Sequence, residues 1–181
     1  MVSRMRVLAS ILLAAALPGA AATLERLTLD EMIQQSTAIV RGRVEAAGTM
    51  ERGPLIYSRW RIRVSERWKG APADTVEIVT PGGTSRGVRQ SFSGAPVLKE
   101  GSEQVFFLWT GKSGLTHIIG LSQGLFSLAE DSSGARILTR PASGETMIDP
   151  KTGALVEDQP VRMRLSELQG RVRRALPAAR Q

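Results

Sequence analysis

The chain contains no cysteine and a single histidine, His117, among its 181 residues. Without cysteine no disulfide and no metal thiolate can form, so packing alone must hold the fold. A closed zinc site takes several nitrogen or sulfur ligands, and one histidine cannot supply them. We therefore expect no metal site and no cofactor, although the carboxylates of Asp131 or Asp149 could bind calcium weakly.

Aromatic residues are also scarce, at 4% of the chain, and the formal net charge of +7 is unevenly placed. Residues 162–181 carry six arginines against the single acid Glu167, whereas residues 23–161 carry 16 basic and 16 acidic residues. A protein that binds nucleic acid shows a basic footprint on its folded surface and commonly stacks bases on aromatic rings. We therefore do not expect nucleic acid as the partner.

Long apolar runs are absent as well. The longest, residues 7–17, has 11 residues, whereas a helix needs about 20 to cross a bilayer. Arg4 and Arg6 precede this run and a stretch of alanines follows it, which is the pattern of a cleavable secretory signal. We expect residues 1–22 to be removed, the mature chain to begin at Thr23, and the protein to be extracytoplasmic, either periplasmic or secreted, with no transmembrane segment.

Thr28 and Glu31 have the spacing of a capping box, in which each side chain accepts a hydrogen bond from a free amide at the start of a helix. Leu29, Met32 and Ile33 recur on one helical face. These residues predict a short N-terminal helix.

Beyond this helix, short apolar segments separated by frequent turns predict a mainly β fold. Apolar and polar residues alternate most clearly in residues 56–67, which places Trp60 and Ile62 inward. Strands are expected at residues 38–46, 56–67, 75–80, 105–109, 115–119, 125–129 and 135–139. Residues 82–101 are rich in glycine, serine and proline, and predict a long loop with at most one short strand around Val88.

The C-terminal segment predicts an amphipathic helix. Ser166 and Gln169 have the spacing of a second capping box. The apolar face of the helix consists of Leu165, Leu168, Val172 and Leu176, and Pro177 follows it. The chain is thus expected to consist of a signal peptide at 1–22, a β-barrel domain at 23–161, and a basic C-terminal helix and tail at 162–181.

Five segments carry a resemblance to known proteins: residues 39–44 (IVRGRV), 56–64 (IYSRWRIRV), 68–70 (WKG), 76–80 (VEIVT) and 81–83 (PGG). Together they resemble a group of uncharacterised bacterial exported proteins, which are similar to the netrin-type barrel. The netrin-type barrel, shared with the tissue inhibitors of metalloproteinases, is an OB-like β-barrel flanked by helices. The resemblance covers roughly residues 28–128 by the same strand-and-turn pattern. It implies that fold here, with a short N-terminal helix and a C-terminal amphipathic helix.

The inhibitory mechanism of the tissue inhibitors of metalloproteinases does not follow from the resemblance. They chelate the zinc of a protease through an N-terminal cysteine that disulfides hold in place, and this chain has no cysteine. A binding or inhibitor-like role that uses another surface is an analogy from fold and not from a site.

Residues 120–124 (GLSQG) match the hydrolase pattern G-x-S-x-G, and His117 lies three residues before this motif. A nucleophile elbow needs a strand, a sharp turn and then a helix, with the histidine after the serine in the chain. Here the segment after Ser122 is strand-like, so the glycines indicate a hairpin or bulge. A serine hydrolase that uses Ser122 and His117 is an alternative.

The clearest candidate binding surface is a set of arginines that period-two alternation places on the outward face of two neighbouring strands. Its members are Arg41, Arg43, Arg59, Arg61 and Arg63. Like charges opposite each other destabilise a sheet, so this face must be neutralised. Glu45 and Glu77 have the parity to do so in part, and the remaining guanidinium groups could receive carboxylate, phosphate or sulfate groups of a partner.

The sequence thus predicts an extracytoplasmic, non-enzymatic binding or inhibitor-like module with an acidic protein or an envelope polymer as partner. A second alternative, besides the hydrolase, is an OB-type oligonucleotide-binding domain. The C-terminal helix, through Arg171, Arg173, Arg174 and Arg180, could also contact an anionic envelope surface peripherally.

Overall fold

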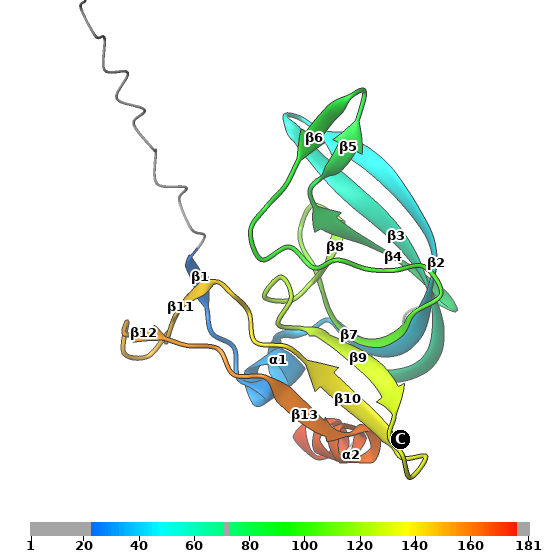
Figure 1. Cartoon of the computed structure of the whole chain (residues 1–181), viewed down its shortest axis with the longest axis vertical. Coiled ribbons are helices and arrows are strands. Elements are labelled where there is room, and N and C mark those ends of the chain that lie inside the picture. The colour runs from blue at the N-terminus through cyan, green and yellow to red at the C-terminus, as the bar shows by residue number, and fades with distance from the viewer. Residues whose placement is uncertain (1–22, 71–72, 177–181) are drawn as a thin grey trace, which may run out of the picture.

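The structure, a computed structural model, describes residues 23–70 and 73–176 (Figure 1). The expected signal peptide, Pro177 and Arg180 lie outside the described residues. In chain order the elements are β1 (Thr23–Glu25), α1 (Leu29–Gln35), β2 (Ala38–Arg52), β3 (Leu55–Lys69), β4 (Thr75–Pro81), β5 (Gly83–Ser85), β6 (Val88–Gln90), β7 (Glu103–Thr110), β8 (Thr116–Ile118), β9 (Leu125–Glu130), β10 (Arg136–Arg140), β11 (Thr146–Ile148), β12 (Leu155–Val156), β13 (Val161–Arg164) and α2 (Leu165–Ala175).

The fold is mainly β, with two helices in the described residues, as predicted. The largest sheet is antiparallel and has the order β13-β10-β9-β7-β2-β3-β4, with β8 paired to β7. This order is open, with β13 at one end and β4 at the other. A small second sheet joins β1 in parallel to β11, which pairs with β12, and so ties residues 23–25 to residues 146–148.

The large sheet buries side chains on both of its faces, because successive residues of a strand point to opposite sides. In β7, Phe107 belongs to the core between the sheet and the helices, together with Ile33 of α1 and Leu168 of α2. Its neighbour Phe106 belongs to a second core, which lies inside the curled β2–β3–β4 part of the sheet with Ile62 and others. The run of buried residues in β7 therefore serves two cores at once.

Helix α1 begins as predicted. The Thr28 amide donates to Glu31 Oε2 at 2.8 Å, and the Glu31 amide donates to Thr28 Oγ1 at 3.2 Å, which completes the capping box. The helix buries Met32 and Ile33.

The motif of residues 68–70 supports the other end of α1. Lys69 Nζ donates to the carbonyl oxygens of Ile33 and Gln34, both at 2.7 Å, where α1 itself has no basic residue in its last turn. A cation at a helix C-terminus is favourable because free carbonyls gather there. Burial lowers the pKa of the Lys69 ammonium. Gly70 follows with φ +71°, and its backbone lies against the carbonyl oxygen of Thr37.

The structure corrects several expected boundaries. Strands β2 and β3, expected at residues 38–46 and 56–67, are longer than predicted, at 15 residues each. They form one ribbon around the turn at residues 53–54. The expected long loop contains two strands, β5 and β6, instead of at most one. The segment expected at 115–119 is a strand only at Thr116–Ile118.

The predicted start of the C-terminal helix is wrong. Helix α2 begins at Leu165, so its N-cap is Arg164, which makes no side-chain capping hydrogen bond. Ser166 and Gln169 therefore do not form a capping box. The boundary expected at 161/162 also falls inside β13, which pairs with β10 in the large sheet. The predicted apolar face is confirmed for Leu165, Leu168 and Val172, which are buried, whereas Leu176 is the C-cap after the end of the helix.

Candidate functional site

The five predicted arginines project from the β2–β3 ribbon on the side away from its inner core. We call this set, Arg41, Arg43, Arg59, Arg61 and Arg63, the arginine face. Arg43 and Arg63 are direct cross-strand partners, and their side chains are 59% and 72% exposed. Arg41 differs, because its side chain is only 11% exposed.

The two carboxylates expected on this face are there. Glu45 pairs with Arg63, and Glu77 lies 3.7 Å from Arg59. Both side chains of the Arg59–Glu77 pair are more than half exposed. Exposed ion pairs of this kind contribute only about 0 to 1 kcal/mol to stability, since water competes for both partners.

The expectation that only two acids face the arginines is wrong, because Glu66 and Glu103 also lie there. Arg41 contacts both, at 2.9 Å through Nη2 and at 3.3 Å through Nε. Glu66 reaches this side because the register of β2 and β3 shifts between Arg41 and Gly42, where β3 has an extra residue. A bulge reverses the alternation beyond it, so Glu66 joins the face of the odd-numbered arginines. Arg41 is therefore held in place.

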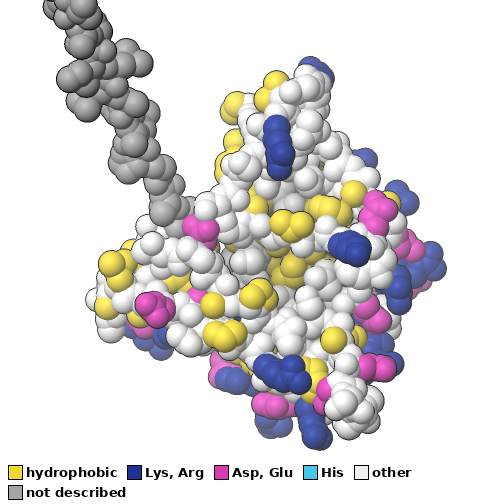
Figure 2. All heavy atoms as spheres, in the orientation of Figure 1, with side chains coloured by type: hydrophobic (Ala, Val, Ile, Leu, Met, Phe, Trp, Pro, Cys, Tyr) yellow, Lys and Arg dark blue, Asp and Glu magenta, His cyan; other side chains and the backbone are white. Residues whose placement is uncertain are grey.

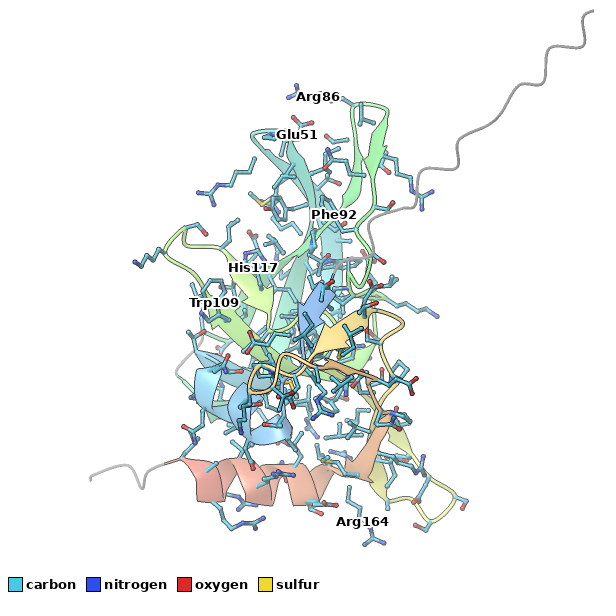
Figure 3. All side chains as sticks on the ribbon, turned by 90° about the vertical axis from the view of Figure 1, so that its left-hand side faces the viewer. Glu51, Arg86, Phe92, Trp109, His117 and Arg164 are labelled. Carbon is cyan, nitrogen blue, oxygen red and sulfur yellow. The ribbon has the colours of Figure 1, made fainter. Side chains whose placement is uncertain are left out.

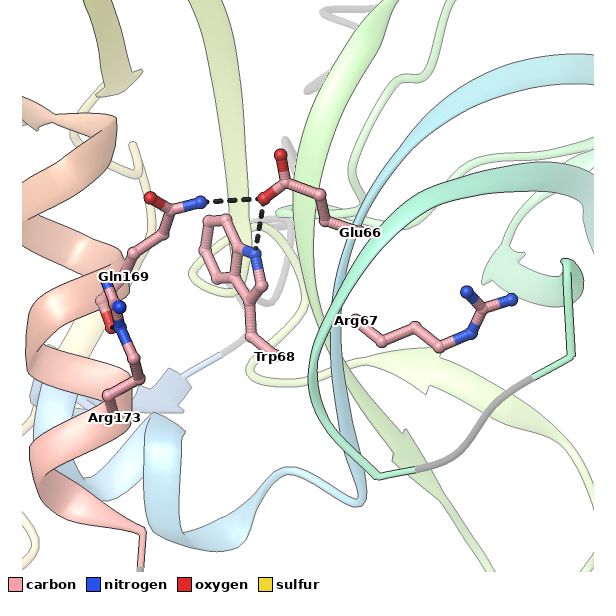
Figure 4. A pocket seen from close by; sticks show the side chains of 5 residues that line it. All are labelled: Glu66, Arg67, Trp68, Gln169 and Arg173. Carbon is pink, nitrogen blue, oxygen red and sulfur yellow. Dashed lines mark hydrogen bonds between the residues drawn. The ribbon is translucent and has the colours of Figure 1, made fainter.

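Glu66 also ties the ribbon to α2 (Figure 4). Its Oε2 accepts hydrogen bonds from Trp68 Nε1 at 2.9 Å and from Gln169 Nε2 at 2.7 Å, while its Oε1 faces Arg41. Gln169, expected in a capping box, thus fastens α2 to the sheet. A pocket of about 390 Å³ lies beside these residues. Of its other polar residues, Arg67 pairs with Asp74, and Arg173 bonds the Gln169 carbonyl within α2. We assign this cluster a structural role.

At the far end of the arginine face lies a small hollow. Ala46 and Gly48 are the cross-strand partners of Arg61 and Arg59. Because these β2 residues have little or no side chain, a hollow of about 60 Å³ remains over them, lined by both arginines, Ala47 and Glu77. Within the described part of the chain, Arg61 is the member of the arginine face for which the structure shows no ion pair.

Ser122 does not stand on a nucleophile elbow. The turn that carries it leads into strand β9, whereas an elbow leads into a helix. Gly120 has φ +59°, and a Cβ at this position would lie 2.9 Å from Gln123 Nε2. The glycine of the motif therefore serves a tight turn over Gln123.

The ring of His117 lies near two aromatic rings. Its ring centroid is 6.3 Å from those of both Tyr57 and Trp109, and Figure 3 shows His117 and Trp109 on neighbouring strands. Burial lowers the pKa of the His117 imidazole. Over the described residues, no hydrogen bond joins His117 to Ser122.

We predict that a fluorophosphonate probe does not label Ser122, because a serine without an adjacent base stays a weak nucleophile. Mass spectrometry of the intact protein after incubation checks this, with an active serine hydrolase as positive control. Stoichiometric labelling that disappears in both Ser122→Ala and His117→Ala would contradict the prediction and support the hydrolase alternative.

The basic helix α2 is bound to the rest of the protein. Arg171 makes two hydrogen bonds to the carboxylate of Asp30, at 2.8 and 2.9 Å, and this contact lowers the pKa of Asp30 and raises that of Arg171. Arg173 bonds back to the Gln169 carbonyl at 3.3 Å. Contact with an envelope surface through Arg174 and Arg180 stays a prediction, with Arg180 outside the described residues.

One polar pocket was not expected from the sequence. It lies between residues 94–97 and 140–145, has a volume of about 400 Å³, and includes Gln104, Ser127 and Arg140 in its lining. The only sequence signal was a glutamine directly before the apolar run of β7. Whether such a glutamine is buried depends on what covers the strand, and one of the two covering segments, residues 140–145, comes from a distant part of the chain.

Within residues 23–70 and 73–176, no helix has both the length and the hydropathy to cross a membrane. In the same residues no three histidine, aspartate or glutamate side chains gather in a way that could hold a metal ion. A comparison of the chain with family models, with curated proteins and with solved structures finds no match in any of the three.

Proposed function

We propose that the protein is an extracytoplasmic, non-enzymatic binding module on an OB-like, netrin-type barrel, and that it binds acidic groups of a partner at Arg59 and Arg61. One observation carries the proposal: Arg61 is exposed, lies outside the ion pairs of the arginine face, and borders a hollow over small residues. The partner is an acidic protein or an envelope polymer.

The small residues of β2 explain why an acidic group can approach there. A Cβ built on Gly48 would lie 3.8 Å from Arg59 Nε and 3.9 Å from its Nη2, so the Arg59 guanidinium lies directly over the glycine. Any longer β2 side chain would compete for the same space. A carboxylate, phosphate or sulfate can instead meet the guanidinium groups, whose planar donors match such anions.

The carboxylate already present does not prevent binding. Glu77 lies 3.7 Å from Arg59, and both side chains are more than half exposed, so the pair is weak and exchangeable. The paired arginines are less suited, because Arg41 is held between two carboxylates and is only 11% exposed, and Arg63 is paired with Glu45. The proposed site is therefore narrower than the whole arginine face.

The double variant Arg59→Glu with Arg61→Glu is expected to weaken binding of poly-L-glutamate at least tenfold, because two attractive charges become repulsive. Isothermal titration calorimetry at low salt measures this. Added salt should weaken wild-type binding, since exposed charges are screened within about 8 to 10 Å at 0.1 to 0.15 M.

The matched control is Lys112→Glu with Lys151→Glu, which changes the net charge by the same amount at two exposed turns. If binding depends on net charge alone, both double variants lose it equally and the proposal fails. It fails as well if the arginine variant binds as the wild type does. Circular dichroism melting of both variants shows whether loss of binding reflects unfolding.

A further inference from the structure

The pocket at Gln104 lies on the other side of the sheet from the arginine face. In Figure 1 the segment between β6 and β7 crosses the front of the molecule, and residues 94–97 of this segment form one wall of the pocket. Residues 140–145, after β10, form the opposite wall. Its volume of about 400 Å³ lies in the range of sites for small ligands.

Two side chains of the lining are buried and not fully bonded. Gln104 and Arg140 are each 7% exposed. Among the described residues, Gln104 Oε1 and Arg140 Nε have no hydrogen-bond partner. Most buried polar atoms in proteins are hydrogen-bonded, so two exceptions in one pocket call for an explanation.

Gln123 shows what a purely structural glutamine looks like in this protein. It is 1% exposed, its Oε1 accepts from the Leu27 amide and its Nε2 donates to the Glu25 carbonyl, both at 2.9 Å. The fold therefore satisfies a buried glutamine amide where that amide connects two segments. Gln104 makes no comparable connection through its Oε1.

The charges of the pocket do not favour an anion. Arg140 is neutralised by Asp158, which it meets through two hydrogen bonds of 2.6 and 2.9 Å. The other charged group of the lining is a carboxylate, Glu145, which accepts from Ser93 Oγ at 2.6 Å. A phosphate or carboxylate ligand would therefore meet no uncompensated cation.

The remaining lining is amide, hydroxyl and aliphatic. Ser122 and Ser127 contribute hydroxyl groups, and Pro96 and Val97 contribute apolar surface, with Val97 90% exposed. Hydrophobic side chains gather in the middle of this face of the molecule (Figure 2). No aromatic side chain is part of the described lining, so a sugar ring has no platform to stack on.

We propose that this pocket binds the main chain of a short, neutral peptide segment. A glutamine side chain carries a carbonyl and an NH2 group like those of a peptide, so it can accept from and donate to one peptide unit. The terminal torsion of glutamine is broad, which allows the Gln104 amide to turn its oxygen toward the ligand. The aliphatic wall suits small side chains such as alanine. This site is independent of the acidic-group site at Arg59 and Arg61.

The test uses the full-length mature protein and nuclear magnetic resonance. Three probes are added in turn: N-acetyl-trialanine amide, glucose and inorganic phosphate. The peptide is expected to shift the backbone amide signals of Ser122 and Ser127 in a saturable way, while glucose and phosphate leave them unchanged. Absence of a saturable peptide shift, or a shift with glucose or phosphate instead, overturns the proposal.

Two variants separate binding from stability. Gln104→Leu removes the unpartnered amide, so it should abolish the peptide shifts while the melting temperature stays at or above that of the wild type. Gln123→Leu, the matched buried glutamine, should lower the melting temperature by several degrees, since about 1 kcal/mol corresponds to 2 to 4 °C in a protein of this size. If Gln104→Leu lowers the melting temperature as much as Gln123→Leu, the amide is structural and the proposal is wrong.

The variant Ser127→Phe is a second test of peptide binding in the pocket. Ser127 is exposed on β9, and a phenyl ring there would fill the pocket. It should block the peptide while the protein stays folded. The Arg59→Glu with Arg61→Glu variant should still bind the peptide, so the failure of one site does not imply the failure of the other.

Discussion

Replacing Asp158 with alanine is expected to lower the free energy of unfolding by about 3 to 5 kcal/mol, because it leaves a buried guanidinium without its counter-charge. The side chains of Asp158 and Arg140 are only 4% and 7% exposed. Asp158 accepts two hydrogen bonds from Arg140 and a third from the Ser143 amide at 2.7 Å. Few domains are more stable than about 15 kcal/mol, so the loss is a large fraction of the total.

The same pair predicts a pH dependence. Burial opposes ionisation of Asp158, but the hydrogen bonds from Arg140 and Ser143 outweigh it and lower the pKa of the carboxyl below 3.8. A carboxyl whose pKa is lower in the folded state stabilises the fold fully above its unfolded pKa of about 4. This stabilisation is lost as the pH falls through the folded pKa. Chemical denaturation between pH 7 and 2 should therefore show a steeper acid loss in the wild type than in Asp158→Asn.

The matched control is Asp74→Ala. Asp74 also pairs with an arginine, Arg67, but its side chain is 97% exposed, so the expected change is at most about 1 kcal/mol. Equal losses for Asp158→Ala and Asp74→Ala would show that burial does not set the strength of these pairs. A wild-type pH profile identical to that of Asp158→Asn would contradict the shifted pKa.

Replacing Gly70 with alanine is expected to lower the free energy of unfolding by about 2 to 5 kcal/mol, the sum of a strained backbone and a steric clash. Gly70 has φ +71°, which a residue with a Cβ adopts only at a cost. The new Cβ would also lie 2.6 Å from the carbonyl oxygen of Thr37, which is backbone and cannot rotate away. Relief of the clash would move Lys69 from the end of α1.

Gly153→Ala isolates the backbone contribution. Gly153 has nearly the same conformation, φ +69°, and no atom of residues 23–70 or 73–176 beyond its chain neighbours lies within 4 Å of the position of a new Cβ. Its replacement should cost only about 1 kcal/mol. Urea denaturation of the two variants measures the difference, and equal losses would mean that the contact with Thr37 does not constrain the fold.

The elements that follow from local sequence were predicted well. The capping box of α1 needs only Thr28 and Glu31, and the outward arginines of β3 need only alternation along one strand. The second half of β2 was missed because Ala46, Ala47 and Gly48 show no alternation of apolar and polar side chains. Their place in a strand is set by pairing with β3.

Features that depend on two distant segments could not be predicted. Glu66 has the wrong parity in a regular strand, and only the shifted register of β2 and β3 brings it beside Arg41. The capping spacing of Ser166 and Gln169 was misleading because Gln169 bonds Glu66 instead. For the arginine face, the positions of the arginines were predictable, but only two of the carboxylates that pair with them were, since Glu103 reaches the face from β7.

The pairing of β1 with β11 and of α1 with α2 has a consequence for folding kinetics. Asp30 and Arg171 are 141 residues apart in the chain, and Gln34 bonds the Ala175 carbonyl across the same separation. Contacts of such high contact order form slowly, because a long loop must close before they contribute. During vectorial synthesis, β1 and α1 emerge first but remain without these partners until residues 146–176 exist. The first elements of the described residues are thus among the last to be fixed.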